Sequence, residues 1–115
     1  MKLTSFLIGA LLAAPTYVLG HHGWSEYDTS KAQKLTGKIV ESGYEHPHGH
    51  IRFEAPGKTW NVVLAPPSRM ENRGLPKEWL KPGASATVEG YPNRNKPEEM
   101  RAERITINGK TIELR

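Results

Sequence analysis

The chain has 115 residues, a length that fits one folded domain of modest size. Its formal charge of +4 is modest, and the chain lacks the dense Lys/Arg clustering that is typical of nucleic-acid-binding proteins. Cysteine is absent, which excludes disulfide bonds, thiolate zinc sites, iron–sulfur clusters and cysteine nucleophiles. Any metal chemistry must therefore use histidine and carboxylate, and all five histidines lie between His21 and His50.

Residues 1–20 have the pattern of a cleaved secretory signal peptide. Lys2 supplies the positive start, and residues 3–14 form an apolar segment that is too short to span a bilayer comfortably. The sequence Val18-Leu19-Gly20 places small or modest-sized side chains at the positions that signal peptidase reads, which predicts cleavage after Gly20. An uncleaved membrane anchor is the alternative. We expect a mature domain of residues 21–115, without a membrane segment, in a Gram-negative periplasm.

Three strands are predicted first in the mature chain. Residues 35–45 combine apolar and β-branched side chains, with Gly37 and Gly43 as expected bulge or bend positions. Residues 50–55 alternate, so that apolar side chains face one way and polar side chains the other. A Pro-Gly turn then leads into a returning strand over residues 58–65.

The second half of the chain predicts a helical connection and further strands. Residues 66–80 are rich in proline and predict one or two short helical turns. Residues 84–91 alternate like a strand, and residues 93–98 form a polar loop. Residues 100–107 and 110–114 predict a hairpin, because the Asn-Gly pair between them is typical of a type I′ turn.

Three strands, a helical connection and two or three more strands are the order of an OB-fold barrel. We therefore expect an all-β fold with little helix, a five- or six-stranded barrel, although an open sandwich has a similar pattern. Closure of the barrel would protect the strand edges of so short a β protein. The predicted core consists of the inward-facing residues Ile39, Ile51, Phe53, Trp60, Val62, Leu64, Val88, Ile105 and Ile107.

The order and spacing of several short motifs resemble a family of small bacterial periplasmic proteins, the domain-of-unknown-function family 6152. The resemblance extends through nearly the whole mature chain and implies the fold and the compartment, but little established chemistry. The sequence departs from the usual family pattern at His46, where asparagine is common, and in the sequence His48-Gly49-His50, which contains more histidine than is usual. The motifs are His21-His22, Leu35-Thr36-Gly37, Pro47-His48, Trp60, Leu80-Lys81-Pro82-Gly83 and Val88-Glu89-Gly90.

The first candidate metal ligands are His21 and His22 at the processed terminus. An N-terminal histidine offers its free α-amine and its own imidazole to one ion, and a further imidazole completes the copper site of histidine-brace proteins. Copper(II) heads the affinity order for such nitrogen ligands. The alternative is a terminus whose histidines are merely solvated.

The second candidate ligands are His46, His48 and His50. In an extended chain, alternate residues project to one face about 6.5–7 Å apart, so three imidazoles can lean toward one ion. Taken alone, His46 is expected to be solvated rather than to bind metal. Glu41 or Glu45 could add a carboxylate ligand, but the histidines are the favoured ligands. Whether the two histidine clusters form one shared site or two separate sites is left open by the sequence. A shared site requires the segment before the first strand to cross near the start of the second.

The remaining side chains narrow the choice of metal. Met70 and Met100 are expected to pack in the fold, so thioether ligands for Cu(I) are lacking, and Cu(II) or Zn(II) is favoured. Trp24 and Tyr27 follow the His pair. They can stack over a metal or a ligand, although packing in the core is the commoner outcome.

Enzyme signatures are missing from the sequence, and Asp28 is its only aspartate. We therefore do not expect an enzyme. The working hypothesis is a periplasmic protein that binds copper, or alternatively zinc, for storage, delivery or resistance. The rival hypothesis is a non-metal OB-like module that docks a periplasmic protein or small ligand through Trp24, Tyr44 and Tyr91. The basic residues around the helical connection favour a solvated face over an anion site, and these are Arg69, Arg73, Lys77 and Lys81.

Overall fold

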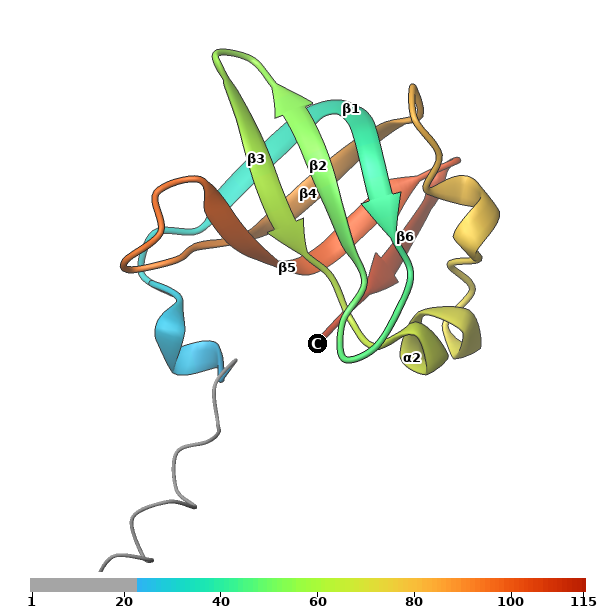
Figure 1. The fold of residues 1–115 in the computed structure, drawn as a ribbon, viewed down its shortest axis with the longest axis horizontal. Helices are drawn as coiled ribbons and strands as arrows, with labels where there is room; N and C mark the ends of the chain where they lie inside the picture. Colours follow the sequence, from blue (N-terminus) through green and yellow to red (C-terminus); the bar gives the residue numbers. More distant parts are fainter. Residues whose placement is uncertain (1–22) are drawn as a thin grey trace, which may run out of the picture.

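The computed structural model describes residues 23–115, so the predicted signal peptide and the pair His21 and His22 lie outside the described residues. Six strands and three short helical segments follow one another (Figure 1). The strands are β1 (Gln33–Gly43), β2 (His50–Ala55), β3 (Lys58–Val63), β4 (Ser85–Pro92), β5 (Glu99–Ile107) and β6 (Lys110–Glu113). The helical segments are η1 (Trp24–Glu26), α2 (Pro67–Asn72) and η2 (Lys77–Trp79).

The strands form one sheet in the order β3-β2-β1-β4-β5-β6, and an additional pairing of β3 with β5 closes it. This closing pairing is parallel, whereas the other pairings are antiparallel. Five strands therefore make the closed barrel, and β6 extends it from β5. The structure confirms the OB-like barrel with a helical connection after the third strand, and closure excludes the open sandwich.

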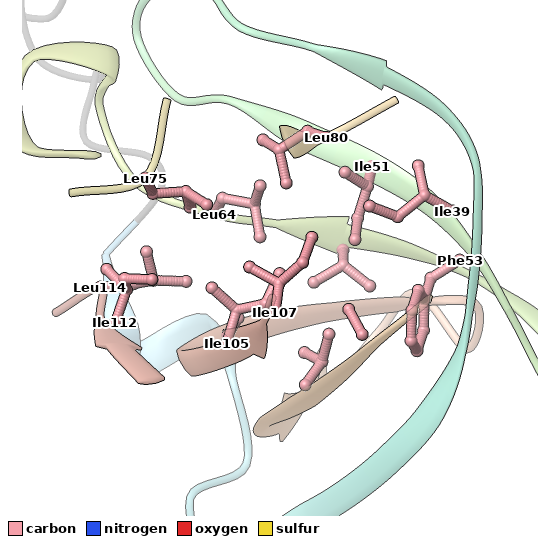
Figure 2. Packing of buried hydrophobic residues seen from close by; sticks show 14 of the residues in the cluster. Ile39, Ile51, Phe53, Leu64, Leu75, Leu80, Ile105, Ile107, Ile112 and Leu114 are labelled. Carbon is pink, nitrogen blue, oxygen red and sulfur yellow. The ribbon is translucent and has the colours of Figure 1, made fainter. Parts of the chain in front are cut away.

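The core fills the inside of the barrel, where alternate side chains of neighbouring strands meet (Figure 2). Strand β2 shows the alternation most simply, because its odd-numbered residues are buried and its even-numbered residues are exposed. All nine side chains predicted to face inward are buried, at 6% exposure or less. Met70 and Met100 are also wholly buried, as predicted. Burial of each large apolar side chain stabilises the fold by about 1.5–3 kcal/mol.

The final hairpin turns as its sequence predicts. Asn108 and Gly109 both have positive φ, at 51° and 76°, which is the backbone of a type I′ turn. The helical connection also forms as expected, since Pro67 starts α2 at a position where its missing N–H is not needed.

Gly37 and Gly43 were expected as bulge or bend positions, and neither forms the bulge. The register shift in β1 falls between Ile39 and Glu41. Gly37 instead permits close contact between strands, because a Cβ at this position would lie 2.1 Å from the backbone oxygen of Glu54. A Cβ on Gly43 would lie 2.3 Å from Cε1 of His50, so the imidazole ring of His50 packs directly against this glycine.

Two cross-strand rows cover the outer face of β1, β4, β5 and β6. Thr36, Thr87, Thr106 and Thr111 pair in register, and hydroxyl hydrogen bonds join the first two and the last two. The neighbouring row alternates in charge and consists of Lys34, Glu89, Arg104 and Glu113. Within residues 23–115, no helix has the length and apolar character needed to cross a bilayer.

Candidate functional site

A pocket of about 280 Å³ opens where η1, the β1–β2 loop and the start of β5 meet. It mixes imidazole, carboxylate, phenol and ammonium groups with apolar side chains. The lining residues are Glu26, Tyr27, Pro47, His48, Gly49, His50, Val63, Lys96 and Glu99. The pocket thus joins the beginning of the described chain to the histidine-rich loop.

Hydrogen bonds to the β4–β5 connection hold η1 beside this pocket. Arg94 donates its backbone N–H to Glu26 O at 2.9 Å and its Nε–H to Ser25 O at 3.0 Å. Asp28 donates its backbone N–H to Pro92 O at 2.8 Å. The first described residues are therefore fixed against the barrel at several points.

Tyr27 anchors the same segment from inside the fold. Its side chain is 2% exposed, and its hydroxyl donates to Glu99 Oε2 at 2.5 Å. Asn93 donates its side-chain N–H to the same oxygen at 3.2 Å. Burial raises the pKa of Tyr27, and the hydrogen bond with Glu99 raises it further. Tyr27 is therefore a neutral donor, and its burial confirms the prediction of core packing.

The β1–β2 loop is held to the end of β3 through Gly49. Gly49 donates its N–H to Ala65 O at 2.9 Å and accepts a hydrogen bond from the N–H of Leu64 at 2.8 Å. A Cβ on Gly49 would lie 2.6 Å from Met70 Cε, so a larger residue at this position would require the end of the buried Met70 side chain to shift. These hydrogen bonds fix the backbone at Gly49, and the residues on either side of it, His48 and His50, line the pocket.

The structure brings two of the three predicted loop histidines together at the pocket. His48 is half-buried and His50 is exposed at the start of β2, and both line the pocket. His46 is exposed and does not line it. Within residues 23–115, no three His, Cys, Asp or Glu side chains gather in a group that could hold a metal ion.

The two carboxylates considered from sequence, Glu41 and Glu45, are not among the residues that line the pocket. Glu41 lies 3.7 Å from Arg52 Nε in an exposed ion pair, and Glu45 is exposed in the loop. The acidic groups that do line the pocket are Glu26 and Glu99, which sequence reasoning missed. Their placement depends on the packing of η1 against β5, a long-range contact for which the sequence offers no local pattern.

Arg101 is the third residue that sequence reasoning missed. It lies on β5 with 6% exposure, and its Nη2 donates toward His48 Nε2 at 3.3 Å. Its guanidinium carbon lies 4.3 Å from the centroid of the Trp24 ring, and that of Arg115 lies 4.4 Å from it. Strand alternation alone does not predict that this arginine is buried. It is covered by η1 and by the end of the chain, which are distant from β5 in sequence or follow it.

The aromatic residues proposed for docking are half-buried rather than exposed. Trp24 packs edge-on against Tyr91, with ring centroids 6.1 Å apart. Tyr44 donates its hydroxyl hydrogen to Leu75 O at 2.6 Å. Arg69 and Arg73, expected on a solvated face, donate to the backbone oxygens of Leu114 and Glu113 at 3.0 and 2.9 Å.

A sequence profile described as "Family of unknown function (DUF6152)" matches residues 10–101. The chain belongs to this family. The match extends from residue 10 through the histidine-rich loop and ends within β5. No curated protein matches the sequence of this DUF6152 member.

Solved structures share the fold of this DUF6152 protein. One is a crystal structure of TiaS in complex with a tRNA and ATP, with a TM-score of 0.51 and 18% identity over 74% of this chain. Another is the ZRD-deleted mutant of TiaS in complex with agmatine, with a TM-score of 0.50 and 18% identity over 74% of this chain. The chain spans 19% and 24% of those proteins, so the similarity concerns the barrel alone.

Proposed function

We propose that the mature protein is a periplasmic metal-binding protein that holds one Cu(II), with Zn(II) as the alternative ion. The ligands are the α-amine and imidazole of His21 together with His48, and His22 and His50 supply further imidazoles. The observation that carries this proposal is the shared pocket: Glu26 of η1 lines the same cavity as His48 and His50. Storage, delivery or resistance is the role such a site serves.

Covalent geometry supports participation of the N-terminal pair. Consecutive Cα atoms are about 3.8 Å apart, so the Cα of His21 lies within about 7.6 Å of that of Gly23. Gly23 precedes η1, whose residue Glu26 lines the pocket with His48. A histidine pair tethered this closely can supply the donors that residues 23–115 lack for a three-ligand site.

The chemistry of the available donors fits Cu(II) better than Cu(I). The pocket offers imidazole nitrogen and carboxylate oxygen, which suit Cu(II) and Zn(II). The two methionines in the described chain, Met70 and Met100, are wholly buried in the core. Their thioethers are therefore withheld from the surface where a soft Cu(I) ion would need them.

The proposal is tested by titrating Cu(II) into the mature chain and into His48→Ala and His46→Ala variants, with affinity measured by calorimetry. His48→Ala is expected to weaken binding by more than about a hundredfold, because even loss of an outer-shell partner costs about 10–100-fold. His46→Ala, the matched control outside the pocket, is expected to leave the affinity within about threefold, since a solvated imidazole supplies no bond to the ion.

Three results would contradict this assignment. Equal weakening by both substitutions would mean that the loop binds copper as a flexible histidine tract. Unchanged binding in His48→Ala would remove the pocket from the site, and an absence of Cu(II) and Zn(II) binding by the mature chain would remove the metal function itself.

A further inference from the structure

The contact between Arg101 and His48 places a permanent cation against a proposed metal ligand. Arg101 Nη2 lies 3.3 Å from His48 Nε2, and the arginine is 6% exposed. A guanidinium group has five N–H donors and no acceptor, and it remains protonated in proteins. His48 Nε2 must therefore be the acceptor in this hydrogen bond, and in a neutral imidazole the proton then resides on Nδ1.

This arrangement leaves His48 without a lone pair for a metal ion. Binding through Nε2 requires the lone pair that Arg101 occupies. Binding through Nδ1 requires its proton to move to Nε2, and the new N–H would then point at the N–H of Arg101. Either way, the hydrogen bond between Arg101 and His48 must break before His48 can bind a metal.

We infer that Arg101 is a positioning residue that gates the proposed metal site: it holds His48 when the metal is absent, and metal binding displaces it. The inference rests on the proposed function, because it concerns the same site. It also gives the site a means of discrimination. Cu(II) and Zn(II) bind imidazole strongly enough to displace the arginine, whereas Ca²⁺ and Mg²⁺ prefer oxygen ligands and gain little from His48.

The gate is connected to the N-terminal segment through Trp24. The guanidinium carbon of Arg101 lies 4.3 Å from the centroid of the Trp24 ring, a cation–π contact that is stronger when desolvated. Trp24 begins η1 and lies two residues after His22. Displacement of Arg101 therefore changes the environment of the segment that carries the proposed N-terminal ligands.

The first test requires no metal and reads the tautomer of His48 directly. Side-chain ¹⁵N shifts are measured by NMR on the metal-free mature chain at a pH where His48 is neutral. We expect a protonated Nδ1 and an unprotonated Nε2. A protonated Nε2 would overturn the inference, whatever the protein binds.

The second test titrates Zn(II) and Cu(II) into the mature chain and its Arg101→Met and Arg115→Met variants. Arg101→Met is expected to raise the affinity about ten- to hundredfold, the range for a lost hydrogen bond to a charged group. Arg115→Met is the matched control, because it removes a cation at 4.4 Å from the same Trp24 ring while leaving the Arg101–His48 contact in place. It is expected to change the affinity by less than about threefold, as for a partly exposed charge.

The outcomes separate this inference from the proposed function. If the mature chain binds metal through His48 but Arg101→Met binds equally or more weakly, the gate is wrong and the site remains. Equal strengthening by both variants would mean that only local charge matters, which also overturns the gate. If neither the mature chain nor Arg101→Met binds either ion, the proposed function fails and the gate fails with it. Chemical shifts of the Trp24 indole, followed with diamagnetic Zn(II), are expected to move with occupancy in the wild type.

Discussion

Phe53 lies on β2 with no exposed surface, and its ring packs at one end of the barrel core (Figure 2). Phe53→Ala leaves a cavity that the closed barrel cannot collapse around, and we expect it to lower the free energy of unfolding by about 3–5 kcal/mol. Urea denaturation measures this loss. Val40→Ala is the matched control, because Val40 is 44% exposed and its truncation is expected to change stability by less than about 0.5 kcal/mol. A loss for Phe53→Ala as small as that of the control would contradict the assigned core.

Inward-facing residues could be predicted from the sequence because strand alternation is a local property. Ile51 and Phe53 are two residues apart and share one face of β2, so the period of two places both in the core. The burial of Arg101 could not be predicted in this way. Its cover comes from Trp24 and Arg115, which are far from it in sequence or at the end of the chain.

At the scale of the elements, Arg104 joins β5 to two neighbouring strands. Its Nε donates to Glu113 Oε2 on β6 at 2.9 Å, and its Nη1 lies 3.2 Å from Glu89 Oε1 on β4. The hydrogen bond from Arg104, together with its charge, lowers the pKa of Glu113 below its ordinary value. Glu113 is therefore more acidic in the folded chain than in the unfolded chain.

This shift predicts a pH-dependent contribution to stability. Because the folded-state pKa is the lower one, the contribution is complete above the unfolded-state pKa and is lost as pH falls through the folded-state pKa. Glu113→Gln is expected to be less stable than the wild type above about pH 5.5, with the difference shrinking below about pH 4. Urea denaturation over this pH range measures it, and high salt should reduce it because the pair is near the surface. A difference that is constant with pH, or that grows in acid, would contradict the assignment.

Strand positions were predicted more accurately than the irregularities within them. The strand predicted over residues 50–55 has the observed bounds, since a Pro-Gly turn ends it and histidine and glycine precede it. The strand predicted over residues 35–45 instead runs over Gln33–Gly43. Its register shift lies between Ile39 and Glu41, where β1 departs from regular pairing with β2, and no residue there signals a bulge.

At the scale of the whole molecule, the barrel could be predicted because the order of strands and helical turns restricts the topology. The juxtaposition of η1 with the histidine-rich loop required the structure. It depends on Tyr27 reaching Glu99 and on Arg94 reaching Ser25, contacts that span 72 and 69 residues. From the sequence, the passage of the segment before β1 near the start of β2 was only a hypothesis.

That juxtaposition makes the free N-terminus central to the account. Cu(II) affinity and stoichiometry should be compared between a chain that begins at His21 and the same chain with its α-amine acetylated. Acetylation converts the α-amine of His21 into an amide, which is a poor metal ligand, and adds no new amine. We predict one Cu(II) per chain with a free α-amine, and binding at least about a hundredfold weaker after acetylation. Equal affinity of the two chains, or two independent ions in either, would contradict a shared site built from the N-terminus and His48.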